Sequence, residues 1–215
     1  MRTKLEMLQM VADTGVVAVL RIPDPEKVIP IFDALKDGGV KCIEITMSTP
    51  NAIGVIAELA KNLPADIALG VGTVLDPETA RAAILAGAEF VVAPTTNFDV
   101  IRMCQRYDKV VMPGAFTPTE ILAAWEAGAD VVKVFPGGVG GPGYIKDIKG
   151  PLPQIALLPT GGVSMENAAE FIKAGAIAVG IGGNLIDKET MASGKYEIIR
   201  DRARKLVDSI AAAKA

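Results

Sequence analysis

A lysine and a glutamate lie in the middle of two strongly apolar segments of the 215-residue sequence. Lys133 lies within residues 131–136, and Glu44 lies within residues 42–46. A charged side chain is costly to bury in such a segment unless its charge is used or paired. Burial lowers the pKa of an amine, and a neutral lysine amine can attack a carbonyl carbon. The pattern therefore predicts a nucleophilic Lys133 with Glu44 as its acid/base group; a structural ion pair between the two is the alternative.

Histidine is absent from the sequence, which excludes a Ser-His-Asp triad and a His-ligated zinc ion. Any proton shuttle must then be a carboxylate, a lysine, a tyrosine or a cysteine. The acidic residues show no metal-ligand spacing, and no glycine-rich nucleotide fingerprint opens a helix after the first predicted strand. We therefore expect neither a metal ion nor a cofactor.

Further polar residues and glycines lie where predicted strands end. Arg21 is suited to a substrate carboxylate or to Glu44, and a structural salt bridge is the alternative. Two glycine pairs at residues 161–162 and 182–183 let backbone N–H groups approach an anion closely, which favours a phosphate site over ordinary turn glycines. Hydroxyl side chains lie in or at the end of three strands: Thr46, Thr73 and Thr160.

These residues must be positioned by the elements around them. Short segments rich in β-branched residues recur at spacings of roughly 20–26 residues and alternate with segments of helical periodicity. The segments are residues 16–21, 41–46, 67–73, 89–94, 109–114, 130–136, 155–160 and 176–180. This alternation predicts an α/β protein, a single (β/α)8 TIM barrel formed by residues 1–215, with an extra N-terminal helix at residues 2–13. An open doubly wound sheet is the structural alternative.

Side chains alternate between the two faces of a strand. If Lys133 and Glu44 face the barrel interior, residues two positions away do so too, and their immediate neighbours face the helices. Capping side chains before prolines and glycines after helices predict helices at residues 77–86, 119–127 and 165–174. The glycine-rich residues 136–143 predict a flexible loop able to cover the site.

Composition excludes several kinds of partner. The net charge is −3 and no basic run is present, so we expect no nucleic acid. No apolar stretch is long enough for a membrane span, and the N-terminal segment lacks the apolar core of a secretory signal, so we expect no membrane association. Cys42 and Cys104 lie far apart in apolar surroundings, which indicates core thiols in a reducing cytoplasm.

Seven phrases, in order, give the sequence a family resemblance. They are VAVLR (residues 17–21), EIT (44–46), GVGTV (70–74), MPG (112–114), TPTE (117–120), KVFP (133–136) and PTGGV (159–163). With them the chain resembles the 2-keto-3-deoxy-6-phosphogluconate / 4-hydroxy-2-oxoglutarate aldolases over essentially its whole length. The resemblance implies a class I aldolase, a lyase that is typically a cytoplasmic homotrimer and acts on a small-molecule 2-keto acid.

The resemblance also implies roles for individual residues. Lys133 would form the Schiff base and Glu44 would move protons. Residues that would bind the 2-keto acid or line its pocket are Arg21, Thr46, Ser48, Thr73, Pro94, Phe135 and Thr160. Residues that would hold a phosphate are Gly161, Gly162, Gly182 and Gly183. The products would be pyruvate and an aldehyde, either glyceraldehyde 3-phosphate or glyoxylate.

Two positions depart from the family pattern. Ser48 stands where some members carry an arginine that contacts the keto acid, and Gly183-Asn184 stands where some members place a serine in the phosphate loop. Both departures leave the choice of substrate open between phosphorylated and unphosphorylated acids. Two other functions remain as alternatives: a sugar-phosphate isomerase or epimerase that uses Glu44 as base, and an engineered barrel used as an assembly subunit.

Overall fold

Strands and helices alternate along the chain in a computed structural model that describes residues 2–215. The strands are β1 (Val16–Leu20), β2 (Cys42–Thr46), β3 (Ala68–Gly72), β4 (Phe90–Val92), β5 (Val110–Met112), β6 (Gly114–Ala115), β7 (Val132–Val134), β8 (Leu157–Pro159) and β9 (Val179–Ile181). The helices are α1 (Lys4–Thr14), the 3-10 helix η1 (Pro25–Lys27), α2 (Val28–Asp37), α3 (Ala52–Lys61), α4 (Pro77–Ala86), α5 (Phe98–Arg106), α6 (Pro118–Glu126), α7 (Gly137–Lys149), α8 (Ala168–Lys173), α9 (Lys188–Ser193) and α10 (Tyr196–Lys214).

The strands form two curled parallel sheets. One sheet has the order β5-β4-β3-β2-β1-β9, and the other has the order β6-β7-β8. Only Pro113 separates β5 from β6, and a proline has no N–H group to donate to a ladder. On the other side, a parallel bridge between Thr160 and Gly180 links the end of β8 to β9. The predicted α/β class is confirmed, and every predicted strand segment overlaps an observed strand; the segment at residues 176–180 ends one residue before β9 does.

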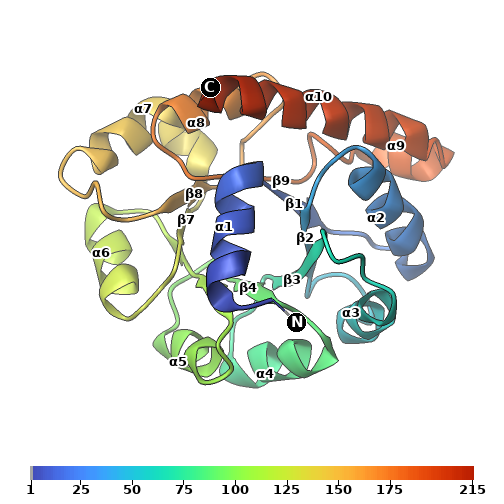
Figure 1. The fold of residues 1–215 in the computed structure, drawn as a ribbon, viewed down its shortest axis with the longest axis horizontal. Helices are drawn as coiled ribbons and strands as arrows, with labels where there is room; N and C mark the ends of the chain where they lie inside the picture. The colour runs from blue at the N-terminus through green and yellow to red at the C-terminus, as the bar shows by residue number, and fades with distance from the viewer. Residues whose placement is uncertain (1) are drawn as a thin grey trace.

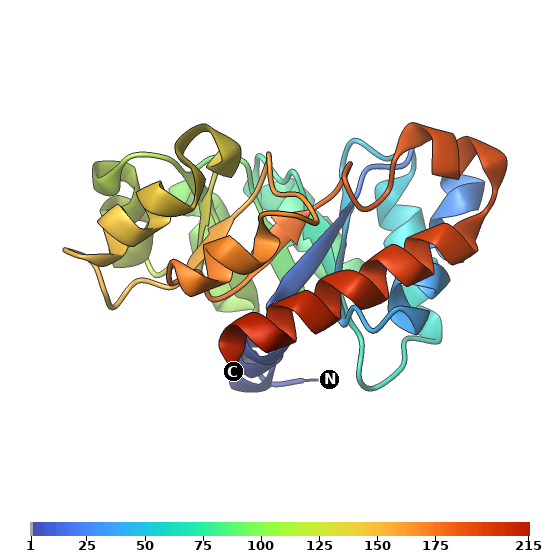
Figure 2. The ribbon, with the colours of Figure 1, turned by 90° about the horizontal axis from the view of Figure 1, so that it is seen from above.

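Helices surround the strands, and α1 lies across one end of them (Figure 1). Figure 2 shows α1 and both chain ends on one side of the strands. The extra N-terminal helix is therefore confirmed. It begins after Thr3, whose side chain accepts a hydrogen bond from the Glu6 N–H in a capping box.

Two hydrophobic clusters confirm the predicted alternation along the strands. The larger cluster lies between strands and helices and contains Ile43, Ile45, Val132 and Val134. The smaller cluster lies inside the sheet, under α1, and includes Met7, Val11, Cys42 and Val131. Because Cys42 and Val131 are two positions before Glu44 and Lys133, both charged residues face the interior.

Capping residues define the helix starts as expected. Asp76 accepts a hydrogen bond from the Thr79 N–H at 2.6 Å, and α4 has the predicted bounds. Thr117 and Glu120 form a capping box at the start of α6, which begins one residue before the predicted position. The third predicted helix is shorter than expected, since α8 starts only after Asn167.

The prediction of a flexible loop at residues 136–143 is wrong, because α7 begins at Gly137. The helix is kinked at Gly141, where φ is 66° and ψ is −172°. Its first glycines pack closely on the β8 end: Gly137 N–H donates to the Thr160 carbonyl at 2.7 Å and Gly138 N–H to the Gly161 carbonyl at 2.6 Å. A Cβ atom at Gly138 would lie 2.8 Å from the Gly162 Cα, so these glycines permit close packing rather than mobility.

Within residues 2–215, no helix has both the length and the apolar character needed to cross a membrane.

Candidate active site

Lys133 and Glu44 lie at the centre of two strands on opposite sheets, β7 and β2. The side chains are almost fully buried, with exposed fractions of 6% for Lys133 and 1% for Glu44. Burial lowers the pKa of the Lys133 amine, and the Arg21 guanidinium lowers it further, whereas the charge of Glu44 raises it. Burial raises the pKa of the Glu44 carboxyl, and the charges of Lys133 and Arg21 oppose that shift. The two pKa values therefore move towards each other, as proton transfer near neutral pH requires.

The direct ion pair between Lys133 and Glu44 is not formed. Among residues 2–215, all ion pairs within bonding distance involve other residues. Each group shifts the pKa of the other electrostatically across the interior of the fold, without a direct contact. This arrangement leaves the amine unblocked for a reacting molecule.

Gly72 makes room for the Glu44 carboxylate, and the sequence analysis assigned it no role. A Cβ atom at Gly72 would lie 2.3 Å from Glu44 Oε1 and 2.6 Å from its Cδ. The Glu44 side chain therefore lies directly over the Gly72 backbone on the neighbouring strand β3. A glycine inside a strand is the signal that could have revealed this close approach.

Replacing Gly72 by alanine should move the Glu44 carboxylate, because the added methyl group and the carboxylate cannot occupy the same space. Overpacking of this kind costs about 1–3 kcal/mol, so we expect kcat/KM to fall by about tenfold or more. Gly143→Ala is a matched control, since a Cβ atom there meets no heavy atom within 4 Å. Full activity of Gly72→Ala would show that the position of Glu44 does not matter.

Arg21, Thr46 and Ser48 lie together at the carboxyl ends of β1 and β2. The hydroxyl groups of Thr46 and Ser48 share a hydrogen bond of 2.8 Å. The Thr49 hydroxyl accepts a hydrogen bond from the Ile22 N–H at 3.2 Å, which ties the loop after β2 to the loop after β1. Arg21 itself is exposed at the end of β1 and acts electrostatically on both buried groups.

Thr73 follows β3 with a φ of 61°, a left-handed conformation that a β-branched residue seldom adopts. Such strain persists where the surrounding structure holds it, and it is concentrated at functional sites. The residue is next to Gly72, so the strained turn lies beside the Glu44 carboxylate.

Pro94 and Phe135 line a cavity of about 380 Å³ at the carboxyl ends of β4, β6 and β7. Other residues of its wall are Thr95, Thr96, Phe116 and Glu120. The Phe135 ring also approaches the catalytic candidate, since Lys133 Nζ lies 5.1 Å from its centroid. Phe116 was not predicted from the sequence; its ring stacks on Tyr144, and the Tyr144 hydroxyl donates to the Phe116 carbonyl at 2.6 Å.

The two glycine loops lie side by side after β8 and β9. Gly161 and Gly162 have φ values of 80° and 77°, which glycine adopts without strain. The Asn184 side-chain amide donates to the Val163 carbonyl at 3.0 Å and so joins the two loops. Thr160 is buried beside Gly180, where a Cβ atom would lie 2.2 Å from its hydroxyl oxygen.

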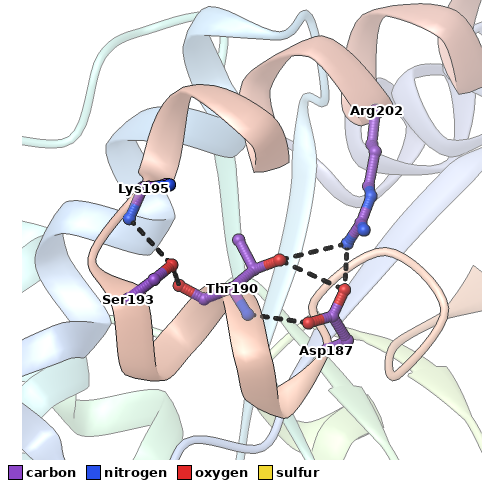
Figure 3. Close-up of polar contacts among 5 residues, drawn as sticks. All are labelled: Asp187, Thr190, Ser193, Lys195 and Arg202. Atoms are coloured by element: carbon purple, nitrogen blue, oxygen red, sulfur yellow. Dashed lines mark hydrogen bonds and ion pairs between the residues drawn. The ribbon is translucent and has the colours of Figure 1, made fainter.

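Asp187 fixes the far end of the loop after β9 (Figure 3). Its carboxylate accepts hydrogen bonds from the Thr190 N–H at 2.7 Å and from the Thr190 hydroxyl at 3.1 Å, and it forms an ion pair with Arg202 of α10. The Thr190 N–H bond, followed by the Arg202 bond, lowers the pKa of Asp187 to about 2. No motif in the sequence predicted this network.

The lowered pKa of Asp187 makes its contribution to stability depend on pH. The ionised carboxylate stabilises the fold fully above its unfolded pKa of about 3.9, and this contribution is lost as pH falls towards 2. We expect the Tm difference between the native protein and Asp187→Asn to shrink between pH 5 and about pH 2.5 in thermal unfolding. Asp201→Asn is the control, because that exposed carboxylate pairs only with the adjacent Arg200. A Tm difference that stays constant with pH would contradict the prediction.

The parallel α/β fold, with a buried lysine, a buried glutamate and glycine loops at the carboxyl ends of the strands, defines an enzyme of small-molecule metabolism. A family model described as "Aldolase: KDPG and KHG aldolase" matches residues 7–201. The chain therefore belongs to the KDPG and KHG aldolase family, and its class is that of an aldolase, a lyase.

Individual relatives agree with this assignment. The chain is 32% identical to a 2-dehydro-3-deoxy-phosphogluconate aldolase of Pseudomonas aeruginosa over 93% of this chain and 90% of that protein. It is 36% identical to a 2-dehydro-3-deoxy-6-phosphogalactonate aldolase of Escherichia coli, over 79% and 83% of the two chains. A KDPG aldolase of Legionella pneumophila, with pyruvate captured as a covalent carbinolamine, has a TM-score of 0.85 and 27% identity, covering 92% and 96%.

These relatives disfavour the two alternatives drawn from the sequence. They are named as aldolases, and the family model is an aldolase model, so an isomerase or epimerase on the same fold is not favoured. The reading as an engineered assembly subunit is not favoured for the same reason.

Proposed function

We propose that the chain cleaves a 2-keto-3-deoxy-6-phospho sugar acid or 4-hydroxy-2-oxoglutarate through an imine formed on Lys133. The products are pyruvate and an aldehyde, glyceraldehyde 3-phosphate or glyoxylate. The observation that carries the proposal is the buried Lys133 amine, whose pKa is lowered by its surroundings. The covalent carbinolamine described for the Legionella relative supports the same chemistry.

In this mechanism the Lys133 amine attacks C2 of the keto acid and forms a carbinolamine. Glu44, whose pKa burial raises, gives the proton that lets the hydroxyl group leave as water, and a protonated imine remains. The imine accepts the electron pair of the C3–C4 bond, and the C4 hydroxyl gives its proton to the Glu44 carboxylate as the aldehyde forms. The resulting enamine is protonated at C3 with help from Glu44, and water hydrolyses the imine to pyruvate and free Lys133.

The remaining predicted residues fit the two ends of such a substrate. Arg21 and Thr73 hold the carboxylate of the keto acid, supported by the Thr46–Ser48 pair. The apolar walls provided by Pro94 and Phe135 exclude water around the imine. Thr160 completes this part of the pocket from the end of β8.

The phosphate of a phosphorylated substrate is held by backbone N–H groups of Gly161, Gly162, Gly182 and Gly183. A Cβ atom at Gly183 would meet nothing within 4 Å, so the space beside this loop is open. The two relatives described above are named as a phosphogluconate aldolase and a phosphogalactonate aldolase, and both names denote a phosphorylated substrate. We expect Ser48 and Asn184 to influence whether the enzyme prefers a substrate of gluconate or of galactonate configuration.

We also propose that the two sheets close into one eight-stranded barrel, in which β5 and β6 are parts of a single strand. The bridge between Thr160 and Gly180 and the single-residue break at Pro113 support this closure. One hydrophobic cluster extends from Val16 to Ile210, which supports a single domain over residues 1–215. The protein acts as a cytoplasmic homotrimer without cofactor or metal, as its family resemblance implies, and its buried thiols Cys42 and Cys104 suit a reducing compartment.

Reductive trapping tests the imine. The protein is incubated with pyruvate and sodium borohydride, its intact mass is measured, and the modified peptide is mapped. We expect one pyruvate-sized adduct on Lys133, and none when pyruvate or borohydride is omitted. A folded protein without an adduct, or with an adduct on another lysine, would overturn the proposal.

A further inference from the structure

Arg202 lies on α10, outside the proposed active site, and is the only charged partner of Asp187 among the ion pairs of residues 2–215. We propose that Arg202 is a positioning residue for recognition of the substrate's phosphate, acting through Asp187 on the glycine loop after β9. This inference rests on the proposed function, since it deepens the role of residues 182–187.

The loop after β9 is a short, well-defined structure between two fixed points. At its start, the Gly182 carbonyl accepts hydrogen bonds from the Leu185 N–H at 2.8 Å and the Ile186 N–H at 2.9 Å. Both of these apolar side chains are buried in the larger hydrophobic cluster. Asp187 follows at once, so only residues 184–186 separate it from Gly183, and a displacement of Asp187 is transmitted to Gly182 and Gly183 through this short segment.

Asp187 uses both carboxylate oxygens to hold the end of this loop. Oδ1 accepts from the Thr190 N–H, while Oδ2 accepts from the Thr190 hydroxyl and from Arg202 (Figure 3). The Thr190 bonds are local to α9, a helix of six residues that has little stability by itself. The Arg202 bond is the one that connects the loop to α10, which packs against α2 and α8.

The effect of this contact is specific to the phosphate end of the substrate. Lys133 and Glu44 lie on β7 and β2, whereas Arg202 contacts only Asp187 and Thr190 among the hydrogen bonds and ion pairs of the described residues. The other glycine loop is held by the start of α7, and the Asn184 amide of the loop after β9 joins it at the Val163 carbonyl. Loss of Arg202 therefore loosens one anion-binding loop without moving the reacting groups.

Arg200 provides a matched control on the same helix. Its guanidinium is 43% exposed, and within residues 2–215 its hydrogen bonds and ion pair go to the adjacent Asp201 alone. Arg200→Ala removes the same functional group from α10 without touching the loop, so it reports any general effect of losing an arginine from this helix.

The experiment compares Arg202→Ala, Arg202→Lys, Asp187→Asn and Arg200→Ala with the native protein on two substrates. For a phosphorylated 2-keto-3-deoxy sugar acid, we expect Arg202→Ala to raise KM by about threefold to tenfold and to change kcat by less than about twofold. For 4-hydroxy-2-oxoglutarate, which has no phosphate, we expect KM and kcat to stay unchanged. Inorganic phosphate, used as a competitive inhibitor, should lose affinity by a similar factor.

Variants of the ion pair separate positioning from a merely structural role. Arg202→Lys keeps a cation and should recover part of the phosphate affinity, while Arg200→Ala should match the native protein. Asp187→Asn keeps the cap on Thr190 but removes the charge, so it should reproduce Arg202→Ala, and the double variant should be no worse than either. If Arg202→Ala is not folded by circular dichroism, Arg202→Lys and Asp187→Asn give the answer.

Equal effects on both substrates, or no effect on the phosphorylated substrate and on phosphate inhibition, would overturn the inference. Pyruvate trapping on Lys133 in every variant distinguishes this failure from failure of the proposed function. An adduct with unchanged phosphate affinity rejects Arg202 alone, whereas absence of the adduct in the native protein rejects the imine mechanism itself. A native protein that forms the adduct but neither turns over the phosphorylated acid nor binds phosphate rejects the inference as well.

Discussion

Replacing Lys133 by methionine should reduce aldol cleavage by about a thousandfold or more, because it removes the amine on which we propose that the imine forms. Methionine has a similar length and no charge, so it fills the same interior space and the fold should survive. The measurement is kcat/KM for cleavage, together with the mass of the protein after pyruvate and borohydride treatment. The variant should show neither turnover nor adduct.

Lys109 offers a matched control for the loss of a buried lysine. It is 9% exposed and lines a separate cavity together with Arg2 and Glu89, two residues of the α1 side of the fold. Lys109→Met should therefore keep its turnover and its pyruvate adduct. If Lys133→Met retained native cleavage, the imine mechanism would have to be abandoned, whatever the control shows.

Replacing Glu44 by glutamine should reduce turnover by about a hundredfold to ten-thousandfold, since it removes the acid/base group and keeps its shape. Because burial raises the pKa of Glu44, the acid limb of the native pH–rate profile should lie above the usual carboxyl pKa of about 4.3. That limb should disappear in Glu44→Gln. The pyruvate adduct should still form, but more slowly, because the amine of Lys133 remains.

The pH–rate profile decides the role of Glu44 more sharply than a single rate does. A structural role would lower Tm and the rate together and leave the shape of the profile unchanged. Retention of the acid limb in Glu44→Gln would assign that limb to another group and would contradict the acid/base role.

Much of the fold could be predicted from the sequence because the same signals repeat along it. Apolar segments of strand length, a capping residue before proline and a glycine after each helix gave the strands, α1, α4 and α6 near their observed bounds. The error at residues 136–143 has a physical cause. Glycines that pack against another backbone and glycines in a mobile loop have the same sequence pattern. Here the close packing of residues 137–138 on the Gly161–Gly162 turn identifies the first kind, and that contact is visible only in the structure.

The site could be predicted from the sequence only where a residue differs in polarity from the segment that contains it. Lys133 and Glu44 are charged residues in apolar strands, and this conflict is visible without a structure. Gly72 and Arg202 show no such conflict, because their importance depends on which distant side chain they meet. Glu44 and Asp187 lie 28 and 15 positions from these partners, so even the glycine inside β3 indicates a close approach without indicating which side chain makes it.

Pro113 separates β5 from β6, and Glu44 and Lys133 lie on different sheets: Glu44 on the six-stranded sheet and Lys133 on the three-stranded sheet. The two sheets are joined on both sides by backbone contacts. The Asp130 and Lys133 N–H groups donate to the Val111 and Pro113 carbonyls, and the Ile177 N–H donates to the Leu157 carbonyl beside the bridge from Thr160 to Gly180. Moving one sheet against the other would break these bonds, whereas the hydrogen bonds within each sheet would stay intact. The separation of Lys133 and Glu44 is therefore set by the few bonds that join the two sheets.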